Sequence, residues 1–266
     1  MSVDRRKFLK IAGLASLGLA LNPSDFILMS PAEASSGKSL PSSGERLGMT
    51  IDVRKFKNDA DYQRIIDACH SIHNVPTLIP EKNDIKNEVK WIWTDTYGHT
   101  FPEQINEYHP QDIKSKKFPL LCNHCDHPPC VRVCPTKATF KSKNGIVSQD
   151  PHRCIGCRFC MAACPYGSRS FNWVDPRPYI AKRDPSFPTR TMGVVEKCTF
   201  CVERLAKGLQ PACVEVSKGA MVFGNLADAH SKLRRVLSTH YTLRRKPAVG
   251  TMPSVFYVIG GQDYAG

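Results

Sequence analysis

Long apolar segments and signatures of organic cofactors are both scarce in this sequence. From residue 35 to residue 266 no stretch approaches the roughly twenty apolar residues of a membrane-spanning helix, so the mature chain is expected to be soluble or peripheral. No C-x-x-C-H marks covalent haem attachment, and there is no flavin, pterin or nucleic-acid motif. No nucleophile is paired with a base. These absences argue against a catalytic domain and leave the cysteines as the strongest signal.

Eight of the twelve cysteines form two runs. The first reads CNHCDHPPCVRVCP from Cys122, and the second reads CIGCRFCMAACP from Cys154. The second run matches the C-x2-C-x2-C-x3-C-P pattern of bacterial ferredoxins, while the first has two additional residues, Pro128 and Pro129, between its second and third cysteines. Both runs end in Cys-Pro. The pattern predicts two cubane iron–sulfur clusters of the 4Fe-4S type.

An exchange of ligands between the two runs explains their spacing. Three thiolates on one tight loop reach three corners of a cubane, and the last cysteine of the other run fills the fourth corner. The first cluster is expected at Cys122, Cys125, Cys130 and Cys164, and the second at Cys154, Cys157, Cys160 and Cys134. Between the runs, residues 139–148 alternate around Asn144-Gly145, which predicts a hairpin with a two-residue turn. The expected fold class is α+β, with ferredoxin-like double-cluster repeats and inserted strands and loops.

Two other uses of cysteine compete with this interpretation. Structural zinc also uses C-x2-C pairs, but it takes two pairs per ion and gives no reason for four-cysteine runs that end in Cys-Pro. Disulfides suit an exported chain with an even number of cysteines, but cysteines so close together in a tight loop seldom form a structural framework. Iron–sulfur clusters account for the spacing where these alternatives do not.

Residues 1–34 have the features of a twin-arginine signal peptide. The segment DRRKFLK contains the arginine pair, an apolar run of eleven residues follows at 11–21, and the A-x-A site ends at Ala34. Cleavage is expected between Ala34 and Ser35, followed by a flexible Ser/Gly-rich leader at 35–48. The apolar run is short for a bilayer, so an uncleaved membrane anchor is the weaker alternative. The signal predicts a location in the periplasm or on the extracytoplasmic face of the membrane.

The remaining elements can be read from periodicity. Residues 49–56 and 89–94 alternate as strands do, and the second of these places two tryptophans on one face, where packing is the expected role. Residues 61–70 have the spacing of a short helix. Residues 193–197 are expected to form a strand that leads into a third group of cysteines, namely Cys198, Cys201 and Cys213.

Four segments resemble a known family. They read CNHCDHPPCVRVCPTKATF, CIGCRFCMAACPYGSR, KCTFCVERLAKGLQPACVE, and AMVFGNLADAHSKL followed later by GTMPSVFYV. They are similar to the exported four-cluster ferredoxin-type subunits of membrane-associated oxidoreductases, a family that includes NrfC, HybA and the iron–sulfur subunit of dimethyl sulfoxide reductase. The resemblance implies an electron-transfer subunit rather than an enzyme. It implies as partners an NrfD-type integral membrane quinone-reactive subunit and a multihaem c-type cytochrome or other redox subunit, with membrane association through them.

The chain departs from the family pattern at two places. Phe56 stands where the first cysteine of an upstream run is expected, and Ser217 stands where a cysteine should close the third group. Only Cys69 survives from the upstream run. The ligand exchange of the family implies that Cys69 completes the third cluster with Cys198, Cys201 and Cys213, and that one cluster is missing. The resemblance thus implies three 4Fe-4S clusters; the alternatives are a 3Fe-4S third site and a Cys69 that is only a buried thiol.

The resemblance also implies an organisation in halves. Residues 49–110 and 190–266 would form a ferredoxin-like half with one degenerate cluster site, and residues 111–189 a half with two clusters. Loss of this one cluster is most similar to DsrO-type subunits of the Dsr complex, which is associated with dissimilatory sulfite reductase. That similarity implies a role in dissimilatory sulfur metabolism. The alternatives are a subunit of a molybdopterin oxidoreductase or periplasmic hydrogenase, and an enzyme with an open cluster.

The basic residues admit two interpretations. Residues 35–266 contain 33 basic and 21 acidic residues, a formal charge of +12. Each oxidised cluster with four thiolates carries a charge of about −2, so part of the excess balances the cofactors, and the rest could steer an acidic partner or anionic lipid. Five cations near the cysteine runs either raise the cluster potentials or belong to a solvated surface: Arg132, Arg153, Arg158, Arg169 and Lys197.

Overall fold

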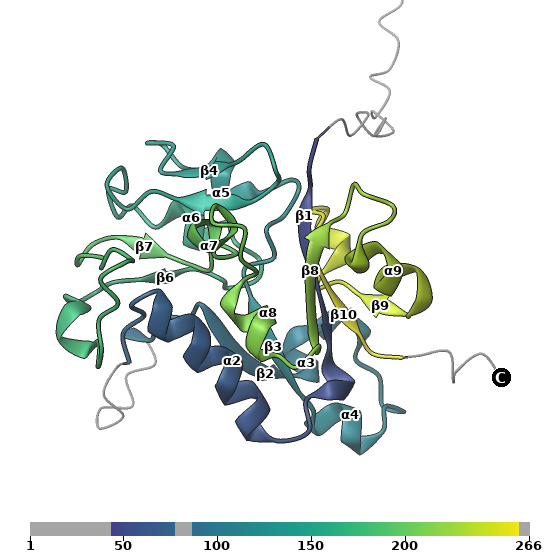
Figure 1. Cartoon of the computed structure of the whole chain (residues 1–266). Helices are drawn as coiled ribbons and strands as arrows, with labels where there is room; N and C mark the ends of the chain where they lie inside the picture. The colour runs from purple at the N-terminus through teal and green to yellow at the C-terminus, as the bar shows by residue number, and fades with distance from the viewer. Residues whose placement is uncertain (1–43, 78–86, 261–266) are drawn as a thin grey trace, which may run out of the picture. The chain divides into compact units, whose positions relative to one another are not determined.

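The computed structural model describes residues 44–77 and 87–260. The expected signal peptide, its cleavage point between Ala34 and Ser35, and most of the expected leader lie outside these residues. The end of the expected leader is ordered, because Leu47 and Gly48 already belong to the first strand. Helices and strands are mixed, so the α+β class is confirmed (Figure 1).

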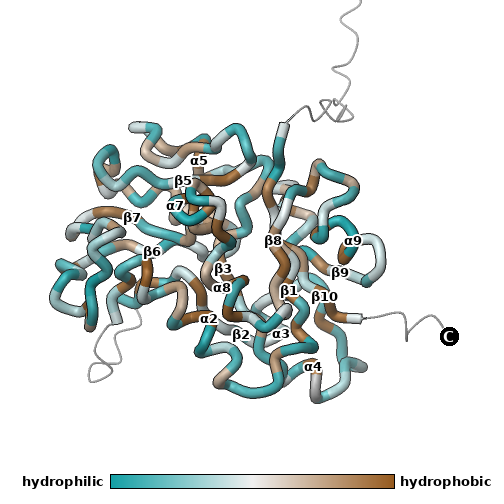
Figure 2. Tube along the Cα trace, viewed as in Figure 1, coloured by the Kyte–Doolittle hydropathy of each residue, from teal (hydrophilic) through white to brown (hydrophobic). Residues whose placement is uncertain are grey.

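A four-stranded sheet brings the two ends of the described chain together. Its strands are β1 (Leu47–Asp52), β8 (Met221–Asn225), β9 (Thr242–Leu243) and β10 (Val255–Val258), in the order β8-β1-β10-β9. β1 pairs antiparallel with β8 and parallel with β10 (Figure 1). Figure 2 shows hydrophobic residues along β1, β8 and β10, which form a large part of the main core.

β1 begins earlier and ends earlier than the expected strand at 49–56. Asp52 ends it, because its carboxylate accepts a hydrogen bond of 3.2 Å from the backbone N–H of Arg54 and starts the 3-10 turn η2 (Val53–Lys55). A side chain that caps a turn in this way competes with the strand ladder. The chain then turns toward the first long helix.

Helix α2 (Asp59–Ile72) positions Cys69 against the core. Asn58 caps it by accepting a hydrogen bond from the backbone N–H of Asp61 at 3.1 Å. Tyr62, Ile65 and Cys69 lie on its buried face, as their helical spacing predicts. The helix packs on α8 (Ala212–Val216), which contains Cys213.

The other strands form three two-stranded sheets. β2 (Ile92–Thr96) pairs with β3 (Lys117–Leu121), β4 (Thr139–Lys141) with β5 (Val147–Gln149), and β6 (Ser170–Phe171) with β7 (Val195–Glu196). The remaining helices are short: α3 (Tyr97–Thr100), η5 (Pro102–Gln104), α4 (Gln111–Ser115), α5 (Pro129–Arg132), α6 (Phe159–Ala162), η6 (Arg177–Tyr179), α7 (Val202–Leu205), α9 (Lys232–Thr239) and η7 (Pro247–Val249). In the described part of the chain, none of the helices has the length and apolar character required to cross a bilayer.

The hairpin between the two cysteine runs is present, but the prediction of a two-residue turn is wrong. Lys141 pairs with Val147, and the backbone N–H of Ser142 donates to the carbonyl of Ile146 at 2.8 Å, so the loop is longer. A two-residue type I′ turn needs positive φ at both central residues, and only Gly145 has it, at 85°. Asn144 instead accepts a hydrogen bond from the backbone N–H of Ile146 through its side chain, at 3.3 Å.

Candidate metal centres

The first predicted set of cysteines lines one cavity. The cavity lies between the loop after β3, α5 and the loop after α6. Pro165, Tyr166 and Arg169 form part of its wall. Its cysteines are those grouped by the sequence spacing, namely Cys122, Cys125, Cys130 and Cys164.

The second predicted set lines a separate cavity. Thr139 and Gln149, from the two strands of the hairpin, form part of its wall. The cysteines that line it are Cys134, Cys154, Cys157 and Cys160. Each cavity therefore receives three cysteines from one run and the last cysteine from the other run.

The third set is assembled from three distant segments. Cys69 lies on α2, Cys198 and Cys201 lie in the loop before α7, and Cys213 lies on α8; all four side chains are buried. Burial raises the pKa of Cys69 well above its usual range, and the neighbouring charges of Cys198, Cys213 and Cys201 raise it further. The four thiols are thus close enough to interact electrostatically.

The three C-x2-C loops share one backbone feature. The residue before the second cysteine has positive φ in each of them: 40° at His124, 71° at Gly156 and 56° at Phe200. Left-handed residues of this kind turn successive backbone N–H groups toward one point and form concave anion sites, including iron–sulfur sites. His124 and Phe200 also stack on each other, with ring centroids 3.6 Å apart, which joins the first and third loops.

Backbone N–H groups donate to cysteine sulfurs of the second and third sets. The N–H of Thr139 lies 3.4 Å from Cys134 Sγ, that of Val195 lies 3.5 Å from Cys154 Sγ, and that of Phe200 lies 3.4 Å from Cys198 Sγ. Hydrogen bonds of this kind stabilise a thiolate and tune the potential of a cluster bound to it.

Several of the thiols require a bound cation to become thiolates. Burial raises the pKa of Cys125 and of Cys201 to about 12. Without such a cation these two groups would remain protonated at neutral pH, because burial desolvates the charged form. Iron binds the thiolate and releases the proton. The donor sets, the cavities and the N–H donors therefore fit iron–sulfur clusters.

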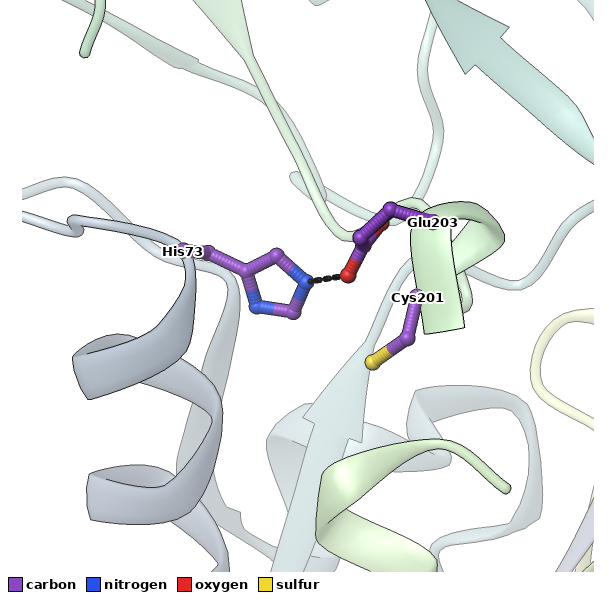
Figure 3. Close-up of side chains that lie close together, drawn as sticks. All are labelled: His73, Cys201 and Glu203. Carbon is purple, nitrogen blue, oxygen red and sulfur yellow. Dashed lines mark hydrogen bonds and ion pairs between the residues drawn. The ribbon is translucent and has the colours of Figure 1, made fainter. Parts of the chain in front are cut away.

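A histidine and a glutamate lie at the edge of the third set, where the sequence did not predict them. Figure 3 shows His73 from the end of α2 facing Glu203 at the start of α7, with Cys201 below them. His73 Nε2 lies 2.8 Å from Glu203 Oε1, while Nδ1 lies 2.8 Å from the carbonyl oxygen of Cys69 and 3.6 Å from its Sγ. One sequence signal points to His73, because it follows Cys69 by four residues and so shares its helix face.

These three side chains also resemble a site for a single metal ion. One ligand atom each from His73, Cys201 and Glu203 lies within 4.8 Å of the others. Such a site would have to take Cys201 from the four-cysteine set, and both nitrogens of His73 already have hydrogen-bond partners. We therefore assign His73 as a hydrogen-bond partner at the edge of the third set.

A buried ion pair fixes the end of α2 to β7, just before Cys198. Arg190 and Glu196 form a contact of 2.6 Å with side-chain exposures of 5% and 3%. Glu196 also accepts a hydrogen bond from the indole N–H of Trp91 at 2.7 Å, and Trp91 is buried in the core, which is the packing role expected for it. The terminal nitrogens of Arg190 donate hydrogen bonds to the backbone carbonyls of His73 and Asn74 at 2.5 and 2.8 Å.

Replacing Glu196 with glutamine is expected to destabilise the protein by about 3 kcal/mol, because it leaves Arg190 buried without its counter-charge. Thermal unfolding of the cluster-loaded protein should show a Tm lowered by roughly 6 to 12 °C. The matched control is Glu215→Gln, which removes an exposed ion pair of 2.6 Å with Arg204 and should change stability by less than about 1 kcal/mol. Equal effects of the two variants would contradict this account.

Ordinary packing occupies the two positions where the family pattern has cysteines. Phe56 is buried and stacks on Tyr62, with ring centroids 4.8 Å apart. Ser217 donates to the carbonyl of Val214 at 2.7 Å and accepts from the N–H of Met221 at 3.0 Å. All twelve cysteines lie in the described residues, and they are accounted for by the three sets.

Comparison with known proteins agrees with this chemistry. Residues 113–226 match the model of the 4Fe-4S dicluster domain. The chain is 39% identical to the Hdr-like menaquinol oxidoreductase iron-sulfur subunit 1 of Archaeoglobus fulgidus, over 98% of this chain and 100% of that protein. The chain belongs to the 4Fe-4S iron–sulfur subunits of membrane-associated oxidoreductases. Members of this family transfer electrons within such complexes, and this chain is an electron-transfer subunit of that kind.

Other members extend the comparison to bacteria. NrfC of Escherichia coli is 34% identical over 83% of this chain and 84% of its own length. A subunit of the tetrathionate reductase of Salmonella typhimurium is 42% identical over 63% of this chain and 63% of its own length. The alignments with the archaeal relative and NrfC extend well beyond residues 113–226, so the likeness also includes the segment that bears Cys69.

Proposed function

We propose that the protein binds three 4Fe-4S clusters and transfers electrons through them. The ligand sets are Cys122, Cys125, Cys130 and Cys164; Cys154, Cys157, Cys160 and Cys134; and Cys198, Cys201, Cys213 and Cys69. The proposal is supported by two cavities that are each lined by four cysteines, by the burial of the remaining four, and by a left-handed residue in each C-x2-C loop. The clusters supply one-electron chemistry, and the chain orients them, donates hydrogen bonds to their ligands and excludes water.

A third set with four cysteine ligands would argue against an enzyme with an open cluster. An open cluster needs a site that lacks one cysteine ligand, and Cys69 lies beside the other three cysteines. Phe56 and Ser217 would mark the position of the cluster that the four-cluster relatives have and this chain lacks. The arrangement in two ferredoxin-like halves, which the resemblance implies, is also part of the proposal.

For partners, we propose an NrfD-type membrane subunit that oxidises or reduces a quinone, and a multihaem c-type cytochrome or other redox subunit. The name of the archaeal relative, a menaquinol oxidoreductase subunit, supports the quinone side. The twin arginine and the A-x-A site in residues 1–34 support export by the twin-arginine route to the extracytoplasmic face, where the protein would associate with the membrane through its partners.

We further propose a role in dissimilatory sulfur metabolism, as in DsrO-type subunits. The name of the tetrathionate reductase relative supports sulfur chemistry, while the menaquinol oxidoreductase name leaves the terminal acceptor open. A place in a molybdopterin oxidoreductase or periplasmic hydrogenase is the alternative.

Electron transfer from membranes tests the proposal. Anaerobically purified protein is mixed with membranes from the native cell and a reduced menaquinol analogue, and bleaching of the iron–sulfur absorption is followed. We expect bleaching that depends on both membranes and quinol. A protein that neither takes electrons from quinol nor, once reduced, gives electrons to a quinone in these membranes would contradict it, as would one that alone turns over a small substrate.

A further inference from the structure

Two of the five cations near the cysteine runs are buried, and three are exposed. Lys197 is 1% exposed and Arg169 is 5% exposed, whereas Arg132, Arg153 and Arg158 face solvent. Exposed charges are screened by water and salt, while a buried charge acts through a medium of low dielectric constant. Of these five cations, the two buried ones should therefore act most strongly on the clusters.

Arg169 stands between the first and second cavities. It lines the first cavity, and its guanidinium donates to Thr139 Oγ1 at 3.2 Å and to Gln149 Oε1 at 3.0 Å, both of which line the second cavity. Although burial opposes it, the neighbouring charges of Cys130 and Cys160 raise the pKa of Arg169. Its second terminal nitrogen is buried without a hydrogen-bond partner.

Lys197 stands between the first and third sets. Its ammonium donates to the carbonyl of Val147, which lines the first cavity, and to the carbonyl of Cys198 at 2.7 Å. Within the described residues, neither Lys197 nor Arg169 forms an ion pair with a carboxylate. A buried cation without a counter-ion is strongly destabilising, so anionic clusters are the fitting counter-charges.

The three sites differ in their buried charges. The first set lies beside both cations, and the second beside Arg169 alone. The third lies beside Lys197, but the carboxylate of Glu203 is close to both Cys69 and Cys201 and offsets that charge. Reduction adds one negative charge to a cluster, so a nearby cation favours the reduced form and raises the potential, and a nearby carboxylate lowers it.

We propose that Arg169 and Lys197 make the cluster of Cys122, Cys125, Cys130 and Cys164 the most easily reduced of the three. This inference rests on the proposed function. It states that Arg169 and Lys197 set the order in which the three clusters are reduced. The first electron that enters the protein resides on the cluster that both cations adjoin.

A redox titration of the intact holoprotein, followed by electron paramagnetic resonance, tests the inference. In Arg169→Gln and in Lys197→Met, the signal that appears first on reduction should move to more negative potential. Of the other two signals, one should move only in Arg169→Gln and the other only in Lys197→Met. The control Arg132→Gln, at an exposed position on α5 that lines neither cavity, should leave all three potentials unchanged.

A conservative variant separates charge from structure. Arg169→Lys retains the charge and should keep the potentials near those of the parent, and iron content measured on every variant shows whether all clusters remain. If Lys197→Met loses iron, the comparison of Arg169→Gln with Arg169→Lys decides, and equal potentials in these two overturn the inference. A first signal that neither variant moves also overturns it. A protein without iron–sulfur signals would instead contradict the proposed function.

Discussion

Replacing Cys69 with serine is expected to break the third cluster. Iron content should fall from about twelve per chain to between about eight and about eleven, the upper value corresponding to a three-iron remnant. The reason is that Cys69 is the only cysteine on α2 and faces the other three members of its set. Metal analysis and electron paramagnetic resonance of the purified protein measure the loss.

Two further variants sharpen this test. His73 Nδ1 lies 3.6 Å from Cys69 Sγ and offers a substitute ligand, so Cys69→Ser is also combined with His73→Phe. The control Ser217→Cys places a thiol where the four-cluster family pattern has a cysteine but without the other cysteines of that pattern, and it should bind no additional iron. Three intact cubanes in the double variant would show that Cys69 is not a ligand.

Replacing Gly156 with alanine is expected to remove the second cluster. An added Cβ would stand 2.4 Å from the carbonyl oxygen of Gly193, and the backbone has φ of +71°. The loop between Cys154 and Cys157 must therefore shift, in addition to left-handed strain of about 1 to 2 kcal/mol. Iron content should fall to about eight per chain, with loss of one signal on reduction.

Gly167→Ala is the matched control for that variant. Gly167 has a similar φ of +63°, but an added Cβ would have no neighbour within 4 Å. Its backbone strain is comparable, so it should lower stability by about 1 kcal/mol and retain every cluster. If both variants keep about twelve irons, the close approach to Gly193 does not shape the second site.

Local signals in the sequence predicted the elements that depend on neighbouring residues. The expected helix at 61–70 lies within α2, because capping by Asn58 and the apolar spacing act over a few residues. The expected strand at 193–197 is reduced to β7, the two residues that pair with β6. The grouping of the first two cysteine sets also follows from spacing within a short stretch.

Features that depend on long-range contacts could not be predicted. The parallel pairing of β1 with β10 joins opposite ends of the described chain, and no local pattern specifies it. Arg158 and Lys197 cannot be distinguished from the sequence, because both are cations next to cysteines. Only tertiary packing leaves Arg158 exposed and buries Lys197. The contact between His73 and Glu203 joins α2 to α7 and was missed for the same reason.

The metal content of the unmodified protein tests the central claim most directly. Anaerobically purified protein, analysed for iron and acid-labile sulfide and examined by Mössbauer spectroscopy, should contain about twelve of each per chain, all in four-iron clusters. About eight irons per chain, or a cluster with a non-cysteine iron site, would contradict the assignment of the twelve cysteines to three complete sets.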